Sequence, residues 1–370
     1  MKQLKKALAF ATAVSGAFIF SAESFAKEII VTAARPNLVV VADAEKREVI
    51  RTHEIPNTHL GNSPGALVVS DDGKVAYVIH NRWETVSGIH LKSGKEVFRA
   101  ELSGIDLRGK APFAIDLSPD NKELAVYVTE TEMLKGEYRV RDPHIAIFDV
   151  TDGIDAKAVR KLPVPRRTSL LAYTPSGDGI YASSWDFNKI DPQTGEILKT
   201  IPWRNWERKN RGAPDTLAIW PQFEQTDIFA TPFFFERTDQ DPNSAARWGA
   251  GIWTLDLNTE KVKYTEFEDM SVVLFSSVVN PVRKNEVYTV YTQLTKTDVN
   301  TGELMKRIDL PHTYYDVNVS ADGKELYVGG TTDDIAVFDS VTLDQIGEIR
   351  IPGGGDQVLS SLRVVDAKWL

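Results

Sequence analysis

The stretch Val68-Val69-Ser70-Asp71-Asp72-Gly73-Lys74 is an apolar strand end that leads into a tight polar turn. The pattern recurs at residues 115–122, 173–178 and 319–324, with weaker copies at 219–222 and 279–282. Each copy ends in Pro, Asp, Asn or Gly, the residues that fit hairpin turns. A β-rich stretch such as Val75-Ala76-Tyr77-Val78-Ile79 follows the turn. The chain is therefore predicted to repeat one antiparallel unit.

A second signature follows each turn, because a strand ends on aspartate in Ile147-Phe148-Asp149 and in Val337-Phe338-Asp339. The same ending occurs at residues 189–191, 254–256 and 296–298, and Thr-Gly-Glu follows at 194–196 and 301–303. This indicates a second hairpin turn that leads into a short outer strand. Four short strands at a period of roughly 40 to 50 residues, without a helical apolar period, are typical of a β-propeller.

Counting the units predicts the number of blades. Complete repeats begin near Pro64, Ala111, Thr168, Pro214, Ser271 and Thr313. Strands expected at 28–33, 38–43 and 48–54 lack a first strand, and residues 357–366 supply one strand without a partner. We therefore predict an all-β fold, a seven-bladed β-propeller of four-stranded antiparallel blades. Pairing of the N- and C-terminal strands closes the ring and removes an exposed sheet edge.

The first residues have the features of a secretory signal. Lys2, Lys5 and Lys6 precede an apolar run over residues 7–20, and Ser24-Phe25-Ala26 places small residues where a signal peptidase reads. We predict a signal peptide over residues 1–26, cleaved near Ala26, and a single β-propeller domain over 27–370. An uncleaved anchor is the alternative. The mature protein is expected in the periplasm and not in a membrane.

Composition excludes several classes of function. With 42% hydrophobic and 26% charged residues, the 370-residue chain is typical of a globular protein with a sizeable core. Its net charge of −9 argues against nucleic-acid binding, which requires clustered Lys and Arg. The chain has no cysteine. This excludes a disulfide, a thiolate nucleophile, a zinc-thiolate site, an iron–sulfur cluster and a Cys-x-x-Cys-His haem attachment.

The remaining polar residues indicate no catalytic, cofactor-binding or metal site in this chain. The six histidines have no metal-ligand spacing; they are His53, His59, His80, His90, His144 and His312. Most aspartates stand where turns need them. Two classes of function remain open. One is a rigid binding scaffold or subunit that shapes a site whose cofactor belongs to another chain; the other is a stand-alone exported hydrolase or lactonase.

Three long stretches exceed a minimal blade, at residues 130–143, 203–211 and 233–251. Partner contacts on rigid scaffolds usually involve such loops. The stretch 203–211 combines two Trp with four basic residues, which suits a binding interface or a loop with a buried Trp. Phe233-Phe234-Phe235 suits either a core strand or a strand end covered by another chain. Tyr314 and Tyr315 suit the central channel, a partner's surface or packing between blades.

Several of these segments carry a resemblance to a known family. Leu310-Pro311-His312-Thr313-Tyr314-Tyr315 and Phe229-Ala230-Thr231-Pro232-Phe233 are the more specific ones. Residues 34–41 and 214–220 are also similar, and the resemblance runs in the same order from about residue 28 to the C-terminus. The chain resembles the β subunit of quinohemoprotein amine dehydrogenase.

The resemblance implies a role in a periplasmic heterotrimer that oxidises primary amines to aldehyde and ammonia. A large subunit carries two c-type haems, and a small subunit carries cysteine tryptophylquinone and the catalytic aspartate. The β subunit packs against the small subunit and helps to wall the substrate cavity, and the electrons leave for a soluble cupredoxin or cytochrome c. The absence of cysteine agrees with a subunit that holds neither cofactor.

On this basis we expect five aromatic residues to face the small subunit or its cavity: Trp206, Phe233, Phe234, Tyr314 and Tyr315. The reason is the aromatic density in the loops and at the starts of the blades. No catalytic residue is assigned to this chain.

Overall fold

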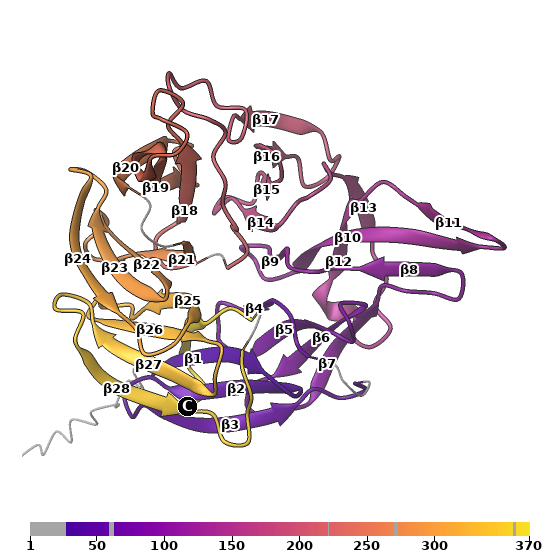
Figure 1. Ribbon diagram of the computed structural model, residues 1–370. Helices are drawn as coiled ribbons and strands as arrows, with labels where there is room; N and C mark the ends of the chain where they lie inside the picture. The colour runs from indigo at the N-terminus through magenta and orange to yellow at the C-terminus, as the bar shows by residue number, and fades with distance from the viewer. Residues whose placement is uncertain (1–26, 59–62, 221, 270–272, 358–359) are drawn as a thin grey trace, which may run out of the picture.

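The computed structural model describes residues 27–370 apart from 59–62, 221, 270–272 and 358–359. The predicted signal peptide, residues 1–26, lies outside the described residues. Seven antiparallel sheets surround a central axis (Figure 1), so the predicted seven-bladed β-propeller is confirmed. The only helices in the described part are two single 3-10 turns, Val150–Asp152 and Ala245–Arg247. None of the described helices has the length and hydropathy that crossing a bilayer requires.

We number the blades in chain order, and the strands of each blade from the axis outward. Blade 1 contains β29 (Arg363–Ala367), β1 (Lys27–Ala34), β2 (Leu38–Asp43) and β3 (Glu48–Glu54). Blade 2 contains β4 (Leu67–Val69), β5 (Val75–His80), β6 (Thr85–His90) and β7 (Glu96–Glu101). Blade 4 contains β14 (Leu170–Tyr173), β15 (Ile180–Ser183), β16 (Phe187–Ile190) and β17 (Ile197–Ile201).

Blades 6 and 7 follow the same order. Blade 6 contains β21 (Leu274–Val279), β22 (Glu286–Tyr291), β23 (Gln293–Asp298) and β24 (Glu303–Asp309). Blade 7 contains β25 (Tyr314–Val319), β26 (Glu325–Gly330), β27 (Asp334–Asp339) and β28 (Gln345–Arg350). These consecutive strands are the predicted repeat.

Blade 3 is extended. Its four strands are β9 (Ile115–Leu117), β10 (Glu123–Leu134), β12 (His144–Asp149) and β13 (Arg160–Pro163). The C-terminal half of β10 also pairs with β8 (Leu107–Lys110) and β11 (Glu137–Val140). These strands form a ribbon that projects from the ring (Figure 1). The loop predicted at 130–143 is therefore largely strand.

Blade 5 has three regular strands, β18 (Ile228–Glu236), β19 (Trp248–Asp256) and β20 (Val262–Asp269). The sequence predicts a first strand after Pro214, but that segment makes only an isolated bridge, between Asp215 and Phe234. Ala218 has a φ of 42°, in the left-handed region that a regular strand does not include. An irregular segment therefore occupies the innermost position of blade 5.

The repeated motifs form the turns that the sequence predicts. In the first motif, the Ser70 hydroxyl accepts the backbone N–H groups of Lys74 (3.2 Å) and Val75 (3.0 Å), and Ser320 does the same for Lys324 and Glu325. In the second motif, the strand-ending aspartate accepts the backbone N–H two residues on. This bond is made by Asp149, Asp191, Asp256, Asp298 and Asp339. Turn chemistry thus accounts for these carboxylates.

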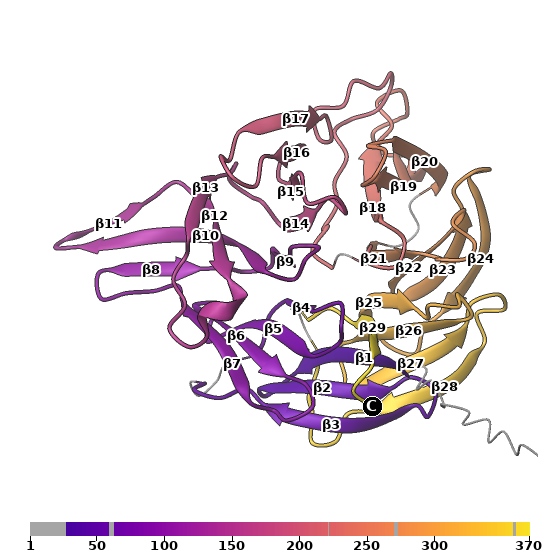
Figure 2. The ribbon, with the colours of Figure 1, turned by 180° about the vertical axis from the view of Figure 1, so that it is seen from behind.

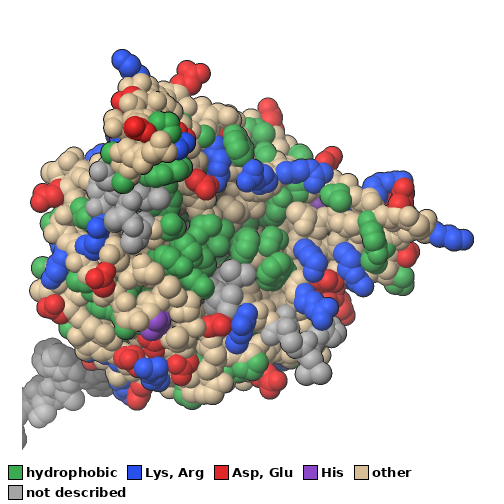
Figure 3. Space-filling view, in the orientation of Figure 1, with side chains coloured by type: hydrophobic (Ala, Val, Ile, Leu, Met, Phe, Trp, Pro, Cys, Tyr) green, Lys and Arg blue, Asp and Glu red, His purple; other side chains and the backbone are tan. Residues whose placement is uncertain are grey.

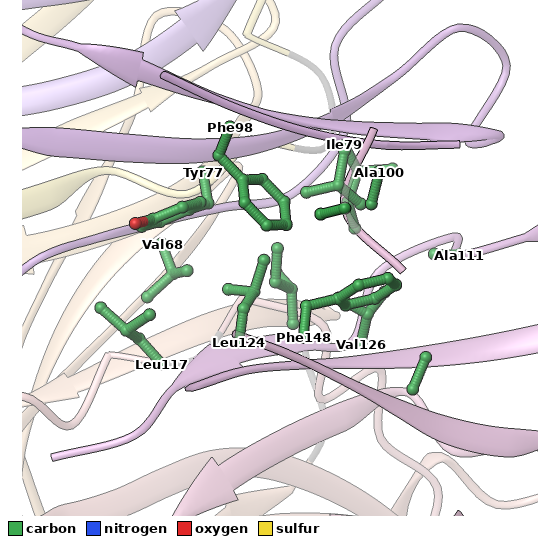
Figure 4. Packing of buried hydrophobic residues seen from close by; sticks show 14 of the residues in the cluster. Val68, Tyr77, Ile79, Phe98, Ala100, Ala111, Leu117, Leu124, Val126 and Phe148 are labelled. Atoms are coloured by element: carbon green, nitrogen blue, oxygen red, sulfur yellow. The ribbon is translucent and has the colours of Figure 1, made fainter. Parts of the chain in front are cut away.

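The hydrophobic core lies between neighbouring blades. Between blades 2 and 3, Phe98 is fully buried and contacts Tyr77 and Phe148 edge-on, at centroid distances of 5.6 and 6.1 Å (Figure 4). Burying one such side chain contributes about 1.5–3 kcal/mol. Since every blade shares its core with two neighbours, a gap in the ring would expose two apolar faces.

The two ends of the chain close that ring. β29 pairs antiparallel with β1, from Lys27 opposite Ala367 to Val31 opposite Arg363, and lies beside it in Figure 2. The predicted closure is therefore confirmed. The strand begins at Arg363, later than the expected 357–366, of which 358–359 lie outside the described residues.

Candidate functional site

The candidate site lies at one end of the ring, which we call the linker face. It consists of the links between successive blades and the loops between the second and third strands of each blade, including residues 81–84, 102–114, 130–143, 164–169, 184–186, 202–217, 237–247, 310–313 and 331–333. The long loops and the predicted site residues gather here. Figure 3 shows a patch of hydrophobic side chains near the middle of the ring, with Lys and Arg side chains beside it.

A pocket of about 630 Å³ opens on this face between blades 5 and 6. Its lining is mainly apolar: Gly212, Ala213, Asp215, Thr216, Leu217, Phe234, Phe235, Glu236, Trp248, Val273 and Phe275. Leu217, Trp248 and Val273 are each about two-fifths exposed. Concave apolar pockets of this kind are where ligands or partners usually bind, so this pocket is the candidate site.

The alternation of β18 directs the middle phenylalanine into this pocket. Phe233 and Phe235 are buried on one side of the strand, and the half-buried Phe234 lies on the other. Gly249 and Gly251 of β19 make room for the two buried rings, because a Cβ there would lie within 2.6 Å of them. The Phe234 backbone exchanges two hydrogen bonds with Asp215, which fixes the irregular inner segment of blade 5.

Four aromatic rings continue the apolar surface across blades 5 to 7. Phe275 stacks on Tyr291 at 3.9 Å, and Trp220 and Tyr315 lie 5.9 and 5.5 Å from Phe275, all within 23° of parallel to it. The ladder between β21 and β22 skips Phe275, and the ladder between β25 and β26 skips Tyr315. Because bulges redirect side chains, these two rings leave the regular core of their blades.

A cationic group adjoins the pocket over blade 4. Trp185 is 44% exposed, and the guanidinium carbons of Arg167 and Arg204 lie 5.1 and 5.6 Å from its ring centroid. The indole Nε1 donates a hydrogen bond to Asn205 (3.1 Å). Arg204 also donates to the carboxylate of Asp215 and to the carbonyl of Thr216, both at 3.2 Å. Since Asp215 and Thr216 line the pocket, the two features form one surface.

The five predicted site residues divide into two groups. Phe234 and Tyr315 are half-buried on the linker face. Trp206, Phe233 and Tyr314 are at most 8% exposed, so this chain's own residues cover them. Trp206 donates a hydrogen bond to the carbonyl of Gly212 (2.7 Å), and the Tyr314 hydroxyl donates to Asp334 (2.7 Å). These three residues support the face rather than form its surface. The contact with a small subunit stays a prediction.

Three residues of the face were not among the predicted ones: Trp185, Trp248 and Phe275. Trp220 was not predicted either, but it is 6% exposed and supports the face by stacking on Phe275 and Tyr315. Trp248 belongs to the long stretch 233–251 that the sequence singles out, and Trp220 lies in a weak copy of the repeat. Trp185 and Phe275 stand in short strand-end segments without a distinguishing pattern. Their place on the face follows from packing between blades.

The histidines are dispersed in the structure. His80 bonds Ser87 and His90 bonds Ser93, while His312 lies 3.2 Å from Asp334. His144 lies 3.8 Å from Glu130, and burial lowers the pKa of its imidazole. His59 lies outside the described residues. Over the described residues, no group of three or more His, Asp or Glu side chains could hold a metal ion.

Two fully buried acids lie on the innermost strands. Asp316 accepts hydrogen bonds from the backbone of Leu362 (2.5 Å) and from Gln222 (2.9 Å), and Asp116 accepts one from the backbone of Tyr173 (2.7 Å). Burial raises the pKa of both carboxyl groups to about 7. These bonds join different blades, so the acids serve the assembly of the ring.

No protein-family model and no curated protein matches the chain. Solved structures match it in fold. Hydrazine synthase from Kuenenia stuttgartiensis has a TM-score of 0.58 and 15% identity, over 83% of this chain and 90% of that one. Apo AztD from Citrobacter koseri has a TM-score of 0.52 and 15% identity, over 93% and 99%.

A third similar structure is the dihydro-heme d1 dehydrogenase NirN in complex with DHE. It has a TM-score of 0.53 and 15% identity, over 91% of this chain and 75% of that one. At these identities the likeness shows the β-propeller fold alone.

Proposed function

We propose that this chain is the propeller subunit of a periplasmic heterotrimeric amine dehydrogenase and carries no cofactor of its own. It holds a small quinone-bearing subunit against the linker face of blades 4 to 7, beside a large di-haem subunit. The observation that carries the proposal is the exposed aromatic surface around the pocket between blades 5 and 6. A rigid ring that exposes such a surface is suited to seat another protein.

The cofactors of such an enzyme do not fit this chain. Thioether attachment of haem c and formation of cysteine tryptophylquinone both require cysteine, and the chain has none. When bound by the partner subunits, these groups supply the two-electron oxidation of a primary amine to aldehyde and ammonia. The resemblance described above supports this assignment, and one of the proteins similar in fold is named a dehydrogenase.

This chain contributes shape and water exclusion. Phe234, Trp248 and Phe275 present apolar rings that wall the cavity of the small subunit, and the closed ring keeps them in place. Exclusion of water strengthens the electrostatic interactions of groups that a partner brings to the site. None of the chemistry requires an acid or base from this chain.

Co-purification tests the proposal. The tagged full chain is purified gently from its host, and the eluate is stained for haem and for redox-active quinone. We expect a large haem-stained partner and a small quinone-stained one. In Phe234→Asp, a carboxylate at the centre of the interface should reduce the amounts of both co-purified partners to less than a tenth of the wild-type amounts.

The matched control is Ile197→Asp, which changes a half-exposed apolar residue on the outer strand β17. It should retain both partners at the wild-type level, and circular dichroism should show that both variants are folded. A wild-type chain that elutes without a haem- or quinone-stained protein would contradict the proposed function and favour a stand-alone hydrolase, a lactonase or another binding scaffold.

A further inference from the structure

The linker face is locally basic although the chain is acidic overall. The links 165–169 and 203–211 together contain six basic residues and one acidic residue, against a net charge of −9 for the whole chain. Both links lie at the linker end of blade 4, beside Trp185. Figure 3 shows Lys and Arg side chains beside the hydrophobic patch on this face.

Arg167 lies closer to the Trp185 ring than Arg204 does. It is exposed, and it forms no ion pair with any residue in the part of the chain that the structure describes. Arg166 pairs only with the almost fully exposed Asp142. Arg208 and Arg211 both bind Glu266 and are turned away toward blade 5. Arg167 therefore supplies uncompensated positive charge at the surface.

The link holds Arg167 in a fixed position. Its φ is 68°, in the left-handed region, and the Thr168 hydroxyl donates a hydrogen bond to the carbonyl of Pro165 (2.9 Å). The Trp185 ring supports the guanidinium from one side at 5.1 Å. A guanidinium stacked on an aromatic ring keeps its N–H edges free, and these edges match a carboxylate in a planar, two-bond geometry.

The cationic group and the apolar pocket are physically joined. Arg204 stacks on Trp185 and also bonds Asp215 and Thr216 of the pocket. A single ligand surface can therefore contact both. Trp and Arg beside an apolar pocket are the combination enriched at the energetic centres of protein interfaces.

We propose that the partner seated on the linker face is acidic there, with side-chain carboxylates that bind Arg167 and its neighbour Arg166 while an apolar side chain fills the pocket. This rests on the proposed function for the identity of the partner. The charge preference belongs to the chain itself, because it follows from the arrangement of Arg167, Trp185 and Arg204.

Titration of the purified full chain with poly-L-glutamate tests the charge preference, with intrinsic Trp fluorescence as the readout. We expect a saturable change at about 20 mM salt that weakens at about 200 mM, since screening weakens exposed pairs. Arg167→Glu should weaken binding about tenfold. Arg167→Lys, which keeps the charge but loses the planar fork, should lie between it and the wild type.

The matched control is Lys92→Glu, the same charge reversal in the exposed turn between β6 and β7 at the opposite end of the ring. It should bind poly-L-glutamate like the wild type. No saturable binding by the wild type, or equal weakening in Arg167→Glu and Lys92→Glu, would overturn the inference. Tighter binding of oligothymidylate than of poly-L-glutamate would also overturn it, in favour of a nucleic acid. Co-purification of the haem- and quinone-stained partners tests the proposed function independently of this titration.

Discussion

Three consecutive phenylalanines have different surroundings in the fold: Phe233, Phe234 and Phe235. The first and third fill the core between blades 4 and 5, where each ring contacts Trp206. The second is half-buried and lines the pocket, whose wall also includes Phe235. The pleat of β18 makes this division, because successive side chains leave a strand on opposite sides. The bulge that frees Tyr315 separates it from the buried Tyr314 in a similar way.

Asp316 shows how burial changes a common residue. Asp191, Asp298 and Asp339 stand where strands end in turns, and hydrogen bonds lower the pKa of their carboxyl groups. Asp316 is fully buried, and desolvation outweighs its hydrogen bonds, so its pKa rises to about 7. The folded protein therefore keeps a proton on Asp316 that the unfolded chain releases near pH 4.

This difference predicts a pH dependence of stability. The contribution of Asp316 to the free energy of unfolding should be fully present below the ordinary pKa of aspartate and should be lost as the pH rises through 7. Asp316→Asn removes one of the two buried acids and should remove ~2 kcal/mol of the decline between pH 5 and pH 8. Urea unfolding of both proteins at pH 5, 6, 7 and 8 measures this decline in the free energy of unfolding.

Asp322→Asn is the matched control, because a hydrogen bond and an ion pair with Lys324 lower the pKa of this half-exposed carboxyl below the tested range. Its unfolding free energy should follow the wild-type slope from pH 5 to pH 8. An unchanged slope in Asp316→Asn would mean that Asp316 is ionised in the folded protein throughout this range.

Among the strands, β29 joins blade 1 to several other blades although it is short. It is five residues long and pairs with β1. Side chains of other blades also hold it: the Arg363 Nε donates to the carbonyl of Leu67 (3.1 Å), its guanidinium pairs with Glu224, and Asn318 donates to the carbonyl of Leu362 (2.8 Å). The strand therefore ties blade 1 to blades 2, 5 and 7.

Deletion of residues 363–370 should abolish the cooperative unfolding of the ring. It exposes the edge of β1, leaves buried partners unpaired and opens the core on both sides of blade 1. We expect a broad thermal transition and soluble aggregates, measured by differential scanning calorimetry and size-exclusion chromatography. Removal of Leu370 alone, which is 44% exposed, is the control and should leave both measurements unchanged. A monomeric deletion variant with a sharp transition would show that the ring stays closed without β29.

The inner segment of blade 5 does not close the ring as β29 does; it leaves a pocket in its surface. Where the other blades place a regular first strand, residues 212–220 form an irregular link with one bridge to β18. The pocket lies along this link, and five of its residues line it. Loss of a regular strand at one position thus creates the concave surface, while the six regular blades keep the scaffold rigid.

At the scale of the whole molecule, the protein is a rigid ring without a residue that can bind haem through a thioether. We therefore expect the chain purified alone to show no Soret band and no amine-dependent reduction of a dye. The co-purified complex, measured at the same chain concentration, should show both. Amine oxidation by the isolated chain would contradict the subunit assignment and favour a stand-alone enzyme.

The repeat predicts the number of blades, and the three N-terminal strands of blade 1 agree with the observed ones to within one residue, whereas its C-terminal strand begins at Arg363 rather than at residue 357. The prediction of turns and strands succeeds because they depend on local chemistry. Ser70 and Asp191, for example, accept hydrogen bonds from backbone groups within five residues of themselves. The interface residues were harder to predict. Aromatic density in the sequence does not distinguish Phe234 from the buried Phe233.

The fold class, the blade count and the closure of the ring could thus be predicted from the sequence, since each rests on turn and strand patterns that repeat along the chain. The residues that form the surface around the pocket could be identified only from the folded chain. The stack of Arg167, Trp185 and Arg204 joins residues up to 37 positions apart, and two bulges and one irregular link expose the rings around the pocket. Such contacts depend on how neighbouring blades pack, and that packing leaves no periodic pattern in the sequence.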